Sequence, residues 1–144
     1  MVSESLGTSS RNSLYSLAAA GGALLGLFLV GAAGGHFTAV WPAVGSGSEL
    51  SAGSRFALLL PGLILALTGL VNIVLCRVLW MGVSWALILV LLCNSLAVMY
   101  LVYLMLSEVA PNHPIGIFTA LVSSYVVLLV ALRMGLVWPA VVDS

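Results

Sequence analysis

Four long apolar segments constrain the fold of this chain more than any other feature. They cover residues 14–37, 56–79, 83–106 and 115–137, and each reaches the length of about 20 residues that an α-helix needs to cross a bilayer. None alternates polar and apolar residues as a barrel strand does. Because a backbone in lipid must satisfy its own hydrogen bonds, each segment is expected to be a helix. The sequence therefore predicts an all-α integral membrane protein with four transmembrane helices.

The composition fits a membrane protein and excludes several other classes. Only 6% of the 144 residues are charged, 62% are hydrophobic, and the mean hydropathy is +1.26. Soluble domains carry about 25% charged residues. The formal net charge is zero, so we expect no nucleic-acid partner. We expect a single four-helix transmembrane domain over residues 14–144, preceded by a mobile polar segment of residues 1–13.

The arginines predict an orientation. In an antiparallel up-down bundle, three of them fall on one side of the membrane: Arg11, Arg77 and Arg133. Arg55 falls on the other side, together with Glu49 and Glu108. Positive residues accumulate in cytoplasmic segments. Both termini are therefore expected on the same, cytoplasm-like side of a membrane whose identity the sequence does not reveal.

The sequence VWPAV occurs twice, at residues 40–44 and 137–141, near the end of an apolar segment each time. Tryptophan favours the headgroup level of a membrane, and proline disfavours helical conformation in the residue before it. We interpret both copies as an interfacial anchor followed by a helix stop, rather than as a duplicated ligand motif. Two further tryptophans flank a tight turn at the sequence WMG. The expected interfacial anchors are Trp41, Trp80, Trp85 and Trp138.

Small residues repeat at helical spacing in three of the four segments. In lipid, such residues allow two helix backbones to approach closely. The expected helix-packing faces comprise Gly22, Gly26, Gly62, Ala66, Gly69, Gly116, Ala120 and Ser124. Leucine at Gly22 and Gly26 is expected to eject the chain from any complex to which it belongs.

The polar residues inside the second and third segments include Thr68, Asn72 and Asn94, which are candidates for a contact between the two helices. Folding these segments about a turn near Met81 puts Thr68 and Asn94 at equal depth, with Asn72 about one helical turn nearer the inner face. A hydrogen bond between Thr68 and Asn94 would contribute about 0.6–2 kcal/mol and fix the register of the two helices. Contact with a ligand or an ion is the alternative interpretation.

Residues suited to catalysis or metal binding are scarce. No Asp, Glu or Lys lies within a predicted span, which disfavours proton-coupled transport. The ionisable residues of the outer side lack metal-ligand or haem-ligand spacing and are expected to be solvated loop residues: His36, Glu49, Arg55, Glu108 and His113. Cys76 and Cys93 form no CxxC pair and are expected to pack as small apolar residues. We predict no catalytic, cofactor-binding or metal site, and no enzymatic activity.

These features predict a non-catalytic accessory or structural subunit of a larger multi-subunit membrane complex. Its expected partners are other transmembrane subunits and membrane lipids or pigments, because a charge-poor chain with short loops has few other surfaces. The alternative is a small homo-oligomeric channel or carrier, in which Asn72, Asn94 and Ser124 line a weakly polar path.

Overall fold

A computed structural model describes the backbone of residues 2–45, 51–107 and 112–142, and the side chains of residues 14–45, 51–107 and 115–135. The described chain forms four α-helices: α1 (Val2–Gly45), α2 (Ala52–Trp80), α3 (Ser84–Leu106) and α4 (Asn112–Val142). Each contains a stretch that is long and apolar enough, by length and composition, to cross a membrane. The prediction of an all-α chain with four helices of this kind is confirmed.

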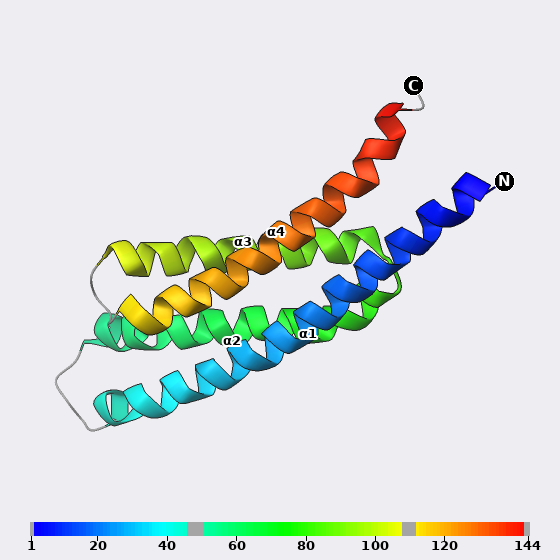
Figure 1. Cartoon of the computed structure of the whole chain (residues 1–144). Coiled ribbons are helices and arrows are strands. Elements are labelled where there is room, and N and C mark those ends of the chain that lie inside the picture. The colour runs from blue at the N-terminus through cyan, green and yellow to red at the C-terminus, as the bar shows by residue number, and fades with distance from the viewer. Residues whose placement is uncertain (1, 46–50, 108–111, 143–144) are drawn as a thin grey trace.

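The four helices lie side by side along most of their length (Figure 1). The start of α1 and the end of α4 lie towards the same end of the molecule as the connection between α2 and α3. The most extensive helix contact is that of α1 with α2, and the contact of α1 with α4 is the smallest. The α1–α2 pair is therefore the main structural unit of the bundle.

Two helices extend beyond the apolar segments. α1 begins at Val2, so the segment expected to be a mobile tail continues the helix. α1 runs through Pro42 to Gly45, and α4 runs to Val142, past the proline of the second VWPAV copy. The predicted helix stop at these prolines is therefore wrong. A proline removes one N–H donor and disturbs the turn before it. Near the end of a helix few hydrogen bonds remain to be lost, so the helix continues for about one more turn after the proline.

A three-residue turn, Met81–Gly82–Val83, joins α2 to α3. Gly82 has a φ of 74°, in the left-handed region that glycine adopts without steric cost. Its N–H donates to the carbonyl of Leu79 over 2.8 Å, and the N–H of Val83 donates to the carbonyl of Val78 over 3.4 Å. These two bonds are those of a Schellman motif, which ends a helix and satisfies its last carbonyls. The glycine of WMG thus sets where α2 ends and where α3 can begin.

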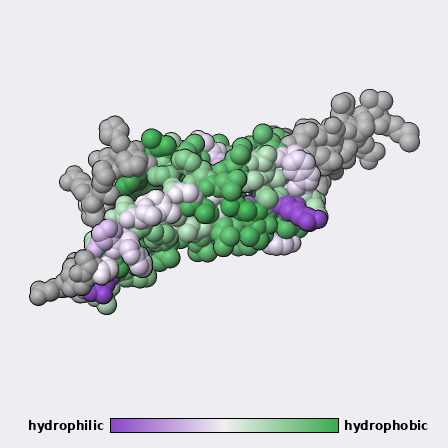
Figure 2. All heavy atoms as spheres, turned by 90° about the horizontal axis from the view of Figure 1, so that it is seen from below, coloured by the Kyte–Doolittle hydropathy of each residue, from purple (hydrophilic) through white to green (hydrophobic). Residues whose placement is uncertain are grey.

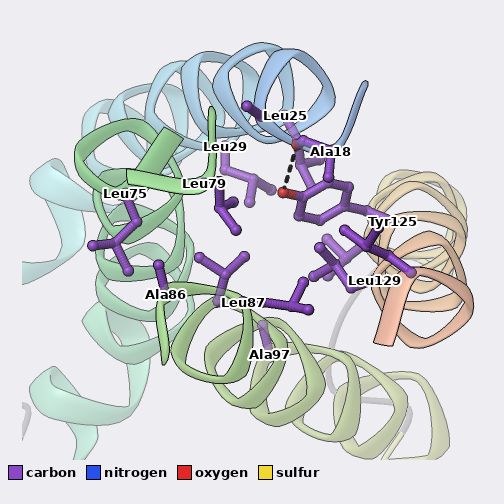
Figure 3. Packing of buried hydrophobic residues seen from close by; sticks show 14 of the residues in the cluster. Ala18, Leu25, Leu29, Leu75, Leu79, Ala86, Leu87, Ala97, Tyr125 and Leu129 are labelled. Atoms are coloured by element: carbon purple, nitrogen blue, oxygen red, sulfur yellow. Dashed lines mark hydrogen bonds between the residues drawn. The ribbon is translucent and has the colours of Figure 1, made fainter. Parts of the chain in front are cut away.

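The interior is built from leucines and alanines that all four helices contribute (Figure 3). Leu29, Leu79, Leu87 and Leu129 come from α1, α2, α3 and α4 in turn, and none is exposed. The buried alanines keep the helices close at Ala18, Ala86 and Ala97. In a membrane, close packing and hydrogen bonds hold helices together, because lipid tails are as apolar as the side chains themselves.

The outer surface carries large apolar side chains on every helix, including Leu27, Leu67, Leu96 and Val127. Figure 2 shows hydrophobic atoms around the middle of the molecule and the strongly hydrophilic atoms towards its two ends. A continuous apolar surface of this extent is unsuited to water. It is suited to lipid tails or to other transmembrane helices.

Candidate functional site

The backbones of α1 and α2 approach each other closely where the helices cross, at Gly26 and Gly69. A Cβ atom on Gly26 would lie 2.7 Å from the carbonyl oxygen of Gly69 and 2.8 Å from Cγ1 of Ile73. A Cβ atom on Gly69 would lie 2.7 Å from the carbonyl oxygen of Gly26. Each glycine therefore makes room for the backbone of the other, and neither position accepts a side chain without moving a helix.

Beside this crossing, Asn72 of α2 and Asn94 of α3 form a reciprocal pair of hydrogen bonds. Nδ2 of Asn72 donates to Oδ1 of Asn94 over 3.1 Å, and Nδ2 of Asn94 donates to Oδ1 of Asn72 over 2.9 Å. Nδ2 of Asn94 also donates to the carbonyl of Val90 over 2.8 Å. Both side chains are 0% exposed. We call these two residues the asparagine pair.

The asparagine pair replaces the expected hydrogen bond between Thr68 and Asn94. Thr68 is buried, but Asn94 bonds to Asn72. Asn72 and Asn94 are equally distant in sequence from Val83, whereas the expected pairing assumed a turn centred on Met81. The Schellman motif delays the start of α3 until Ser84. The residue of α2 that lies level with Asn94 therefore shifts by about one helical turn, from Thr68 to Asn72.

The chemistry of the asparagine pair is that of a structural contact. Amide side chains do not titrate, and each carbonyl oxygen of the pair already accepts a hydrogen bond. Ser124, the third residue of the expected polar path, is exposed on α4 and donates to the carbonyl of Ala120 over 2.8 Å. The three residues are therefore not brought together within one chain.

A second polar contact joins α4 to α1. The hydroxyl of Tyr125 donates to the carbonyl of Ala18 over 2.9 Å (Figure 3). A Cβ atom on Gly22 would collide with this hydroxyl and would lie 3.2 Å from Cζ of Tyr125. Gly22 thus leaves the space that Tyr125 fills. The signal in the sequence for this contact is a tyrosine inside an apolar segment, because the hydroxyl of a buried tyrosine needs a hydrogen-bond acceptor.

The predicted packing faces divide into an inner and an outer group. Gly22, Gly26 and Gly69 serve contacts within the chain, and so does Gly62, where a Cβ atom would lie 2.8 Å from both His36 and Phe37. Ala66 is half-buried. Replacing Gly22 and Gly26 therefore alters the fold of the chain itself and is no test of its association with a partner, contrary to expectation.

The predicted face of α4 is largely open, and Ser124 lies at the edge of an open groove between α1 and α4. Ala120 and Ser124 are exposed, and a Cβ atom on Gly116 would meet nothing within 4 Å. The buried side of α4 consists instead of larger residues: Ile115, Val122, Tyr125, Leu129 and Leu132. We call Gly116, Ala120 and Ser124 the outer α4 stripe.

His36 was expected in a solvated loop, and the structure corrects this. It is a half-buried residue of α1, and its Nε2 atom lies 2.8 Å from the carbonyl oxygen of Leu58. Leu58 comes three residues before Pro61, whose ring disturbs the preceding turn of α2. Carbonyls near a proline in a membrane helix often accept from a neighbouring helix, and His36 donates to Leu58 in the tautomer that carries its hydrogen on Nε2. The position of His36 is therefore explained by helix packing.

The other residues named in the sequence analysis lie near helix ends, are half-buried, or fall outside the described side chains. Trp41, Trp80 and Trp85 are exposed and lie near helix ends. The side chains of Trp138, His113, Glu49 and Glu108 fall outside the described residues. Cys76 and Cys93 are half-buried free thiols. Among the side chains that the structure describes, no three His, Cys, Asp or Glu residues are grouped so as to hold a metal ion.

The contacts that stand out all join one helix to another. The glycine crossing and the asparagine pair connect α1, α2 and α3, and Tyr125 connects α4 to α1. The site is therefore a centre of helix packing. Comparison of the chain with protein-family models, with curated proteins and with solved structures found no match.

Proposed function

We propose that the chain is a non-catalytic accessory subunit of a larger membrane complex, which it joins through the outer α4 stripe. The observation that carries this proposal is the orientation of that stripe. Gly116, Ala120 and Ser124 follow one another at four-residue spacing on a largely open side of α4, with Ser124 at the edge of an open groove between α1 and α4. In lipid, a face of small residues gives no benefit against acyl chains but allows close approach of another helix.

The polar interior favours this proposal over a channel or a carrier. The side chains of Asn72 and Asn94 bond to each other and are fully buried, so within one chain they offer no surface to a solute. A transport path needs polar groups that face a cavity or a partner subunit. In the homo-oligomeric alternative, Ser124 is the one residue of the three that could line a path between subunits.

The proposed function is tested with two matched double variants. Gly116→Leu with Ala120→Leu fills the outer α4 stripe, and Gly31→Leu with Gly35→Leu places the same side chains at the same spacing on an open part of α1. After purification in mild detergent, we expect the α4 variant to retain no more than about one tenth of the partner subunit that the wild type retains. The bulky side chains hold the helices apart. Quantitative mass spectrometry of the co-purified proteins measures this ratio. Partner loss from the α1 variant alone would contradict the proposed interface.

We further propose that the four helices cross the membrane as an antiparallel up-down bundle with both termini on the cytoplasm-like side. Arg77 in the last turn of α2 and Arg133 late in α4 support this orientation through the positive-inside rule. Single cysteines replacing Ser5 and Ser144, with Cys76 and Cys93 changed to alanine, should resist an impermeant thiol reagent in intact cells. A cysteine replacing Ser48 should react. The opposite pattern of labelling would reverse the orientation.

A further inference from the structure

An open groove of about 300 Å³ lies between α1 and α2, at the end of α2 that leads into the turn. Its α1 wall consists of Ala19, Ala20 and Ala23, and its α2 wall of Cys76, Arg77 and Trp80. The alanines keep the α1 wall shallow, so that the two helices leave space between them. The volume is at the lower limit of about 300–1,000 Å³ that is usual for ligand pockets, and suits one elongated segment of a molecule.

The charge in this groove is unbalanced. Among the described residues that line it, Arg77 is the only charged one, and its side chain is exposed. Within the part of the chain that the structure describes, no hydrogen bond or ion pair engages its guanidinium group. Its place in the last turn of α2 gives it a favourable interaction with the helix dipole, but that leaves its five N–H donors free. The planar fork of an exposed guanidinium matches the geometry of a phosphate, which can accept two of its hydrogen bonds.

Trp80 indicates that the Arg77 end of the groove lies at the level expected for the boundary between headgroups and hydrocarbon. Trp80 lies three residues after Arg77, on the same side of α2, and 61% of its surface is exposed. Tryptophan is enriched at the headgroup level of membranes. From Ala19 to Ala23, α1 runs away from this level towards its crossing with α2 at Gly26. The groove therefore begins with a cation at the headgroups and continues as an apolar channel towards the membrane centre.

We propose that this groove binds one anionic phospholipid. Its phosphate lies on the guanidinium of Arg77, its headgroup lies beside Trp80, and the first part of one acyl chain lies over Ala20 and Ala23. A lipid with net negative charge fits better than a zwitterionic one, because the residues described along the groove include no carboxylate to pair with an ammonium group. Basic pockets between transmembrane helices are known sites for such headgroups. The site does not depend on the proposed accessory function.

The test is lipid retention by the full chain after purification from membranes that contain phosphatidylglycerol and phosphatidylcholine. We expect native mass spectrometry to show phosphatidylglycerol bound to the wild-type chain in preference to phosphatidylcholine. Arg77→Gln should lower this retention at least about tenfold, since a charge-assisted hydrogen bond is lost. Arg133→Gln, which removes an exposed arginine from α4, should leave it unchanged.

A third variant separates the groove from the charge. Ala20→Leu keeps Arg77 but fills the apolar part of the groove, and because Ala20 is exposed the substitution does not disturb the core. It should also lower the retention of phosphatidylglycerol. Unfolding in lipid-free detergent checks that each variant is folded. Equal retention of the two lipids by the wild type, or equal loss from Arg77→Gln and Arg133→Gln, would overturn the proposal, as would full retention by Ala20→Leu.

Discussion

Replacing Gly26 by leucine is expected to lower the stability of the folded chain by about 3 kcal/mol or more. A Cβ atom at this position would lie 2.7 Å from the carbonyl oxygen of Gly69, which is backbone and cannot move aside as a side chain can. The two helices must separate, and their separation disturbs Asn72, whose Cβ atom is only 3.2 Å from the same point. The loss should appear as unfolding at much lower denaturant concentration in detergent.

Gly31→Leu is the matched control for this variant. Gly31 lies on the same helix, and a Cβ atom there would meet nothing within 4 Å. We expect it to change stability by no more than about 0.5 kcal/mol. Gly26→Ala should fall between the two leucine variants, because the Cβ atom alone already collides. Equal stability of Gly26→Leu and Gly31→Leu would show that α1 and α2 do not cross at Gly26.

Loss of one member of the asparagine pair is expected to cost about 1–2 kcal/mol. Asn94→Leu removes both hydrogen bonds and leaves the amide of Asn72 buried without a partner. The double variant Asn72→Leu with Asn94→Leu should cost less than the sum of the two single variants, because no amide is then left unsatisfied. The coupling energy from a double-mutant cycle measures this difference.

Thr68→Val is the control that distinguishes the asparagine pair from the pairing that the sequence predicts. It removes the hydroxyl of Thr68 with little change in shape, and Thr68 is buried as well, with 4% of its surface exposed. We expect no coupling between Thr68→Val and Asn94→Leu. Additive effects of the two asparagine variants, together with coupling between Thr68 and Asn94, would restore the register centred on Met81.

Span positions could be predicted because length and hydropathy alone decide which segments suit a bilayer. α3 matches its predicted segment within one residue, since a tight turn fixes its start. Helix ends were harder to predict. The prolines of VWPAV stand where α1 and α4 are already near their ends. Each helix continues for about one turn beyond its proline instead of stopping before it.

The contacts between helices were less predictable than the helices. Pairing of Asn94 with Asn72 depends on the number of residues that the Schellman motif places in the turn, which the apolar pattern does not encode. Small residues mark close approach of helices but do not say to which helix. Gly26 serves a contact within the chain, whereas the outer α4 stripe is left open.

The role of the chain as a subunit is best examined by measuring the native mass of the complex that it forms. The chain, of 14.9 kDa without its tag, is extracted in mild detergent, and the mass of its complex is measured by native mass spectrometry. We expect a mass that includes other polypeptides in fixed ratio to this chain, and loss of those polypeptides from the variant with leucine at Gly116 and Ala120. A mass equal to the chain alone, or to a whole-number multiple of it, would contradict the accessory role and favour a homo-oligomeric channel or carrier.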